Sequence, residues 1–184
     1  MAGEGEGRRG VRALSLRQPY CHAVLYGGKS IENRRWQPVD PKLLEELRHG
    51  FLIHAAKGMP RAYYAEAMAF IASVMGAEKC AEFLSDFTAR AHFGGIVGRA
   101  RLVEIVKPWV AEFSHGKGAL GQRPMPAELL ERFYPPGVNP KWHMREQWGF
   151  ALADVTPLPF TPLKGRLSFF RVPEYLVPYE PGLS

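Results

Sequence analysis

Four side chains in one short stretch have the chemistry to hold a polar, planar ligand: Lys29, Glu32, Arg34 and Trp36. Alternate side chains of an extended strand project to the same face, so Glu32, Arg34 and Trp36 would lie together, with Lys29 at the preceding turn. A guanidinium is a planar fork for phosphate or carboxylate. An indole is a surface on which a base stacks, and a carboxylate accepts an N–H. The combination suits a nucleotide-like ligand.

The same residues allow two other interpretations. Glu32 and Arg34 can pair with each other on a half-exposed strand while Trp36 fills the core. Alternatively, Lys29 can act as a base or nucleophile if a cleft desolvates it and lowers its pKa, although a nearby carboxylate favours the charged form. Lys29 and Glu32 are therefore candidates either for a fixed ligand-binding ion pair or for the acid and base of a hydrolysis.

The flanking sequence predicts the elements that position this stretch. Residues 12–17 alternate between polar and apolar and predict a strand, and a helix follows Pro19, because proline suits a first helical turn. Gly27 and Gly28 end that helix, since glycine adopts the left-handed cap conformation at little cost. The next strand covers residues 30–36. Gln18 and Tyr20 lie at the strand-to-helix corner, where Gln18 either reads a base edge or makes a buried structural hydrogen bond.

Residues 27–34, GGKSIENR, fit the pattern GxKxxExR, and on this motif the chain resembles the ASCH domain family of the PUA-like superfamily. The flanks fit too: SLRQPY at 15–20, RW at 35–36, LIHAAK at 52–57, and the segments 94–106 and 147–165. The resemblance covers most of residues 11–173. It implies an α+β fold, a PUA-like mixed, partly open β-barrel of about five or six strands with inserted helices. It also implies ligands that are RNA, DNA or modified nucleosides.

Together, the residues and the resemblance define a candidate site. Its predicted ligand-binding residues are Gln18, Tyr20, Gly28, Lys29, Glu32, Arg34, Trp36 and Lys57. Some family members are amidohydrolases that remove the acetyl group of N4-acetylcytidine, and in those the motif lysine is catalytic and a threonine occupies the position of Glu32. Glu32 thus departs from that branch, and Glu104 is only a nominal candidate for its further catalytic acid. Lys29 and Glu32 are the predicted catalytic pair if the protein is an enzyme.

The charge and composition of the chain indicate which kinds of binding partner to expect. The chain has 24 Lys and Arg against 18 Asp and Glu in 184 residues, a formal charge of +6 that favours RNA or another nucleic acid. Two cysteines without a Cys-x-x-Cys make no disulfide framework, which predicts reduced thiols and a cytoplasmic location. No apolar run approaches the roughly 20 residues of a membrane span, and the histidines lack metal-ligand spacing. We expect no membrane partner, no metal and no cofactor.

The rest of the chain predicts one domain, residues 11–173, between a disordered tail at 1–10 and a proline-rich tail at 174–184. An amphipathic helical insertion occupies 58–93, and its aromatic residues, Tyr63 and Tyr64 among them, are predicted to pack in the core. An irregular excursion with a short helix at 127–133 occupies 108–146. A short helix is predicted to begin after Asp40, which can cap it, with Pro41 in its first turn. Strands are predicted at 51–56, 94–107, 147–155 and 166–172, and a proline-rich crossover at 156–165.

Three functions remain at this stage. The first is binding of nucleic acid, most of all RNA, or of a modified nucleoside through a basic cleft built on GxKxxExR. The second is hydrolysis by Lys29 and Glu32, as an N4-acetylcytidine-type amidohydrolase or a ribonuclease. The third is a protein-interaction or coactivator-like module whose interface is the helical insertion. The sequence leaves the oligomeric state open.

Overall fold

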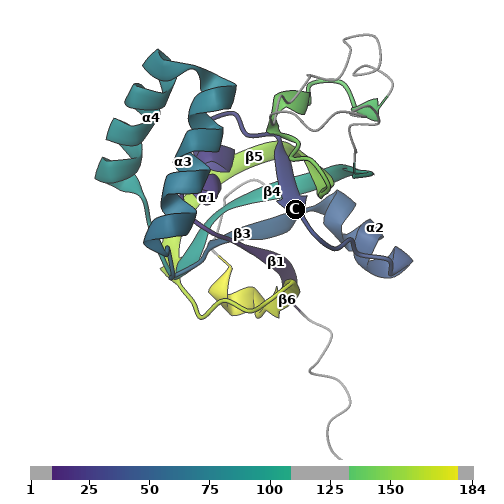
Figure 1. Cartoon of the computed structure of the whole chain (residues 1–184). Helices are drawn as coiled ribbons and strands as arrows, with labels where there is room; N and C mark the ends of the chain where they lie inside the picture. The colour runs from purple at the N-terminus through teal and green to yellow at the C-terminus, as the bar shows by residue number, and fades with distance from the viewer. Residues whose placement is uncertain (1–9, 109–132, 178–184) are drawn as a thin grey trace, which may run out of the picture.

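The computed structural model describes residues 10–108 and 133–177, which form a mixed α+β structure around one sheet (Figure 1). The strands have the spatial order β2-β5-β4-β3-β1-β6, and the sheet is open. Strands β1 and β3 are parallel, and the other neighbours are antiparallel. The elements are β1 (Val11–Leu16), α1 (Tyr20–Tyr26), β2 (Ile31–Arg34), α2 (Pro41–His49), β3 (Phe51–Ala55), α3 (Arg61–Met75), α4 (Ala77–Arg90), β4 (Gly95–Val106), β5 (Trp148–Pro162), β6 (Phe169–Val172) and two short 3₁₀ turns, η1 (Pro140–Trp142) and η2 (Glu174–Leu176).

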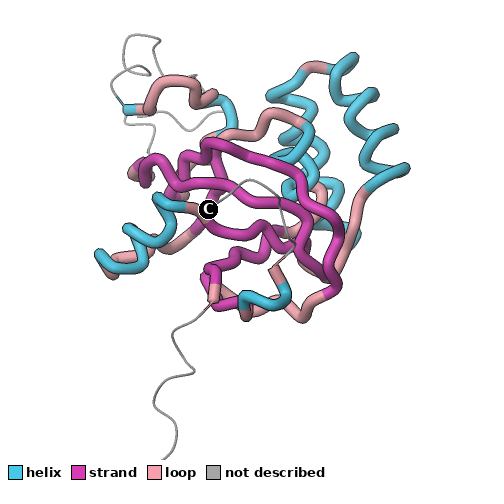
Figure 2. Tube along the Cα trace, turned by 180° about the vertical axis from the view of Figure 1, so that it is seen from behind, coloured by secondary structure: helices cyan, strands magenta, loops and turns pink. Residues whose placement is uncertain are grey.

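The two longest strands bend the sheet. The pairing of β4 with β5 shifts register at three places, and such bulges kink a strand and increase its twist. The curvature brings β1 close to β2, although the two strands are not sheet neighbours. Their proximity is shown by the Arg34 Nη2, which donates to the Ser15 carbonyl at 2.7 Å. Figure 2 shows the helices on the flanks of these curved strands. Helices α3 and α4 lie side by side on one flank, with α1 between them and the strands, and α2 lies on the other.

Two buried clusters lie on opposite faces of the sheet's central strands. One includes Leu14, Ile53 and Phe150 and receives Cys21 and Val24 from α1. The other places Ile31 and Ala151 against the helical pair, through Ile71, Phe83 and Phe87. Each fully buried Leu, Ile or Phe contributes about 1.5–3 kcal/mol of burial free energy. These contacts hold α1, and the turn that follows it, firmly against β2 and β5.

Several predicted features of the local structure are confirmed. The Asp40 side chain accepts the backbone N–H of Lys42, and Pro41 opens α2. Gly28 has φ +66°, the left-handed region that favours glycine. The backbone N–H of Lys29 then returns to the Ala23 carbonyl, at 3.0 Å. This turn directs the chain from α1 into β2.

The predicted proline-rich crossover at 156–165 is wrong. Strand β5 continues to Pro162, and Pro157 and Pro162 pair with Gly98 and Gly95 of β4. Strand β2 covers only residues 148–151 of β5. The rest of β5 is therefore an open edge on that side, where a proline loses no ladder hydrogen bond.

Other predicted boundaries also differ from the structure. Strand β2 ends at Arg34, so Trp36 lies just beyond it, and β6 begins at Phe169 rather than at residue 166. In the predicted C-terminal tail, residues 174–176 form η2, and Leu176 and Val177 pack on the cluster around Ala13 and Phe170. Residues 1–9 and 178–184 of the predicted tails, residues 109–132 of the excursion and all but the last residue of its helix lie outside the described residues.

Candidate functional site

Lys29 is a buried ammonium, with 1% of the residue exposed. The turn after α1 places its side chain beneath β2, where Nζ donates to the Ile31 carbonyl and, at 2.9 Å, to Glu32 Oε2. The same nitrogen lies 5.3 Å from the centre of the Tyr20 ring, a cation–π contact. Lys29 therefore has a carbonyl, a carboxylate and an aromatic face around its charge.

Glu32 joins Lys29 to Arg34. While Oε2 accepts from Lys29, Oε1 lies 3.1 Å from Arg34 Nη2, which also donates to the Ser15 carbonyl. The Arg34 side chain is 20% exposed, yet its Nε is buried and has no hydrogen-bond partner among the described residues. We call Lys29, Glu32 and Arg34 the charge cluster; two cations share one carboxylate, and one buried donor is unused.

The pKa values in this cluster follow from burial and from that excess of positive charge. Burial lowers the pKa of Lys29 below its usual value, although Glu32 opposes the change. Burial alone would raise the pKa of Glu32, but the charges and hydrogen bonds of Lys29 and Arg34 outweigh it and hold that pKa below its usual value. Glu32 is therefore ionised near neutral pH.

The predicted common face of Glu32, Arg34 and Trp36 is confirmed, even though Trp36 follows the strand. Glu32 pairs across the sheet with Phe150, and the Trp36 ring packs edge-on against Phe150 at 5.5 Å. The guanidinium carbon of Arg34 lies 5.9 Å from the Trp36 ring. Trp36 thus belongs both to the buried aromatic cluster and to the border of the charge cluster.

Gln18, Gly28 and Lys57 have other surroundings. The buried Gln18 amide accepts from the backbone N–H of His22 at 3.0 Å and donates to the His92 carbonyl at 2.9 Å. It ties α1 to the segment before β4. Gly28 shapes the turn that buries Lys29, and the exposed Lys57 lies close to Gly94. Within the described residues, these hydrogen bonds and contacts of Gln18 and Lys57 do not involve the charge cluster.

Two residues outside the predicted site, Tyr63 and Arg17, lie next to the charge cluster by way of Tyr20. The Tyr63 ring, on α3, meets the Tyr20 ring edge-on at 6.0 Å, and the guanidinium carbon of Arg17 lies 5.2 Å from its centre. Burial and the Glu32 charge raise the pKa of Tyr63. The sequence assigned Tyr63 to the core with Tyr64. Consecutive helical residues point about 100° apart, and it is Tyr64 that stacks on Phe87.

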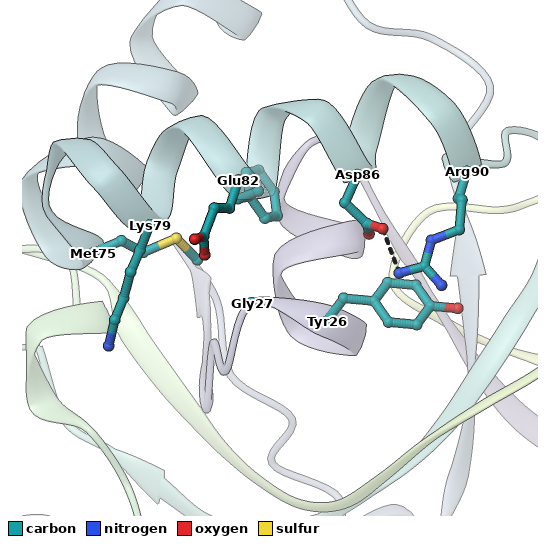
Figure 3. Close-up of a pocket in the computed structure, with 8 residues that line it drawn as sticks. Tyr26, Gly27, Met75, Lys79, Glu82, Asp86 and Arg90 are labelled. Carbon is teal, nitrogen blue, oxygen red and sulfur yellow. Dashed lines mark ion pairs between the residues drawn. The ribbon is translucent and has the colours of Figure 1, made fainter.

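A separate groove of about 400 Å³ lies between α1 and α4 (Figure 3), and Lys29, Glu32 and Arg34 are not among the residues that line it. Arg90 lies over the Tyr26 ring at 4.7 Å and pairs with Asp86, which also holds the buried His22 at 2.7 Å. These charges satisfy one another, so the groove leaves no buried polar group in need of a ligand. It is lined by Tyr26, Gly27, Met75, Lys79, Glu82, Phe83, Asp86 and Arg90.

Over the described ranges, no three His, Cys, Asp or Glu side chains gather in a way that could hold a metal ion. Nor does any helix in those ranges combine the length and apolarity needed to cross a membrane. Cys21 and Cys80 are both free thiols.

Comparison with known proteins adds no relative. No protein-family model matches the chain, and no curated protein matches it either.

Proposed function

We propose that the protein binds RNA, or a modified nucleoside, at the charge cluster, on a PUA-like, partly open barrel of the ASCH type. The observation that carries the proposal is the state of Arg34. Its guanidinium is fixed by Glu32 and by the Ser15 carbonyl, while its buried Nε has no partner among the described residues. An unsatisfied buried donor costs about 1–3 kcal/mol, and a small shift of the partly exposed Arg34 side chain would bring Nε to a ligand acceptor and recover that cost.

The neighbouring groups fit a nucleobase. Arg34 donates to an acceptor on the base or to a phosphate, and each Glu32 oxygen keeps a lone pair with which to accept an N–H. The aromatic rings of Tyr20 and Trp36 border the cluster. Base edges are accessible in this way in single strands, loops and flipped nucleotides. The formal charge of +6 favours a polynucleotide, of which RNA is the proposed kind.

The test is binding of four fluorescent pentaribonucleotides that differ only in the central base, with two uridines on each side. Arg34→Lys keeps the charge and removes the planar fork, and we expect it to weaken binding about 10-fold or more, for a loss of about 1.4 kcal/mol or more. The matched control is Arg48→Lys on α2, an exposed arginine that pairs with Glu45. Absence of binding above background at about 50 mM salt, where electrostatic attraction is strong, would refute the proposal.

A hydrolase is the second candidate, and the lowered pKa of the buried Lys29 favours it. In this reaction water adds to the acetyl carbonyl of N4-acetylcytidine, and the C–N bond breaks to give acetate and cytidine. Lys29 or Glu32 would move the proton. Incubation of the substrate with the wild type and with Lys29→Met, read by mass spectrometry, decides the matter. Loss of the acetyl group only with the wild type supports an enzyme, and intact substrate in both samples contradicts it.

The third expectation, an interaction module, gains little support from the helical insertion. Within residues 58–93, the exposed large hydrophobic side chains are Leu84 and Phe93, at 39% and 37%. A docking surface of that kind usually presents a contiguous apolar patch. A cytoplasmic location remains part of the proposal.

A further inference from the structure

An arginine outside the motif lies over an aromatic ring at the border of the charge cluster. Arg17 follows the last residue of β1 and is exposed, and its guanidinium carbon is 5.2 Å from the centre of the Tyr63 ring. Tyr63 meets Tyr20 edge-on, and Tyr20 lies over Lys29. Arg17, Tyr63 and Tyr20 therefore form a continuous series of contacts from solvent to the charge cluster.

The contact leaves Arg17 ready for a second planar group. Within the described residues Arg17 makes no ion pair or side-chain hydrogen bond; its guanidinium contacts the Tyr63 ring, and the residue remains exposed. A guanidinium is planar and weakly hydrated, and unstacked RNA bases pack on arginine planes as they do on aromatic rings. Because Tyr63 already orders Arg17, binding loses less side-chain entropy.

The surroundings favour a nucleotide strand over an isolated base. The backbone N–H of Ala56 donates to the Leu16 carbonyl at 2.8 Å, which brings the exposed Lys57 to the same end of the sheet as Arg17. Arg61, also exposed, begins α3 two residues before Tyr63. Glu66 is the acidic neighbour on that helix, so cations are in excess where phosphates would pass.

We propose that Arg17, held by Tyr63, is the stacking platform for the nucleobase next to the one bound at the charge cluster. The protein then recognises at least two consecutive nucleotides of single-stranded RNA in preference to a free nucleoside. This inference rests on the proposed function and adds specificity residues to it. It also assigns Lys57 and Arg61 to the phosphates of the same strand.

The test measures whether the penalty for removing one flanking base depends on Arg17. The probes are the tightest-binding pentaribonucleotide and two derivatives with an abasic residue immediately 5′ or 3′ of the centre. With the wild type, one of the two derivatives should bind about 5- to 150-fold more weakly, the equivalent of 1–3 kcal/mol of stacking. Arg17→Lys keeps the charge without the plane, so its abasic penalty should fall to about 2-fold or less, inside the few-tenths kcal/mol scatter of additive sites.

Substitutions of Tyr63 test the support beneath Arg17. Tyr63→Phe keeps the ring and should retain the abasic penalty, whereas Tyr63→Leu should lose most of it. Tyr175→Leu is the control, because Tyr175 is 84% exposed in η2, outside this series of contacts. Thermal melts check that Tyr63→Leu is folded. If it is not, the abasic penalties of Arg17→Lys and Tyr63→Phe still test the inference.

The possible outcomes distinguish a failure of this inference from a failure of the proposed function. If the wild type binds no oligonucleotide, the proposed function fails and the inference fails with it. If Arg34→Lys weakens binding but the abasic penalty is the same in Arg17→Lys as in the wild type, the inference alone is overturned. Binding of the free nucleoside as tight as that of the pentaribonucleotide overturns it as well.

Discussion

Glu32→Gln should be one of the most destabilising conservative substitutions in the chain. The substitution removes the carboxylate that pairs with both Lys29 and Arg34, so two cations are left side by side, and Lys29 is only 1% exposed. Breaking a buried ion pair by removing one partner costs about 3–5 kcal/mol. For a domain of this size, about 2–4 °C of melting temperature is lost per kcal/mol, so the melting temperature should fall by about 6–20 °C. Lys29→Met should lower the free energy of unfolding by less, about 1–3 kcal/mol, because Glu32 still pairs with Arg34.

The assay is urea unfolding at pH 7, followed by tryptophan fluorescence, on the two single variants and on the double variant. The double variant should cost less than the sum of the singles, because each single leaves a charge that the other was compensating. Glu45→Gln is the control: Glu45 pairs with Arg48 and His49 on the surface of α2, where such pairs contribute about 0–1 kcal/mol. If Glu32→Gln costs no more than Glu45→Gln, the charge cluster is not the buried, mutually compensating unit described above.

Three further expectations concern pH and glycine geometry. Because the folded state lowers the pKa of Glu32, the stability that its ionised carboxylate contributes is present above the unfolded pKa of 4.5 and is lost as pH falls through the folded pKa. The loss of unfolding free energy caused by Glu32→Gln should therefore be smaller at pH 3.5 than at pH 7. A larger loss at low pH would contradict a lowered pKa. Gly28→Ala should destabilise by about 1–2 kcal/mol because φ is +66° in otherwise open space, and Gly28→Asn by less; equal effects in urea unfolding would argue against backbone strain as the cause. Gly165→Ala would bring a methyl group to 2.3 Å from the His54 ring and 2.7 Å from Ser15 Oγ, costing about 1–3 kcal/mol, and His54→Ala in the same chain should relieve most of that cost in melting temperature.

Much of the charge cluster could be predicted because it depends on local geometry. Glu32 and Arg34 are two residues apart on a strand, so they must share a face, and Gly28 is the residue that turns the chain back so that Lys29 can reach them. Asp40 and Pro41 likewise predicted the start of α2 from local preferences alone. In each case the determining partner lies within a few residues along the chain.

The features that were missed depend on contacts between distant segments. The prolines of β5 are tolerated because β2 is short and leaves that edge open, which no pattern within β5 reveals. Arg17 meets Tyr63 only because α3 packs beside the end of β1. The Gln18 amide donates to the carbonyl of His92, near the end of the helical insertion, so of the two roles that the sequence left open for Gln18, the structure shows the buried hydrogen bond; its distant partner could not be predicted.

Burial assigns different roles to the two cations of the motif. Lys29 is internal and has its ammonium surrounded, so it holds the Glu32 carboxylate in place and raises the local positive charge without meeting solvent. Arg34, the last residue of β2, is partly exposed and retains an unused donor. A ligand that keeps the fold unchanged therefore meets Arg34 and Glu32 first, whereas a reaction at Lys29 requires the substrate to displace the Ile31 carbonyl or the Tyr20 ring. Lys29→Met separates the two cases, because it should abolish hydrolysis outright but weaken RNA binding only as far as Glu32 loses its orientation.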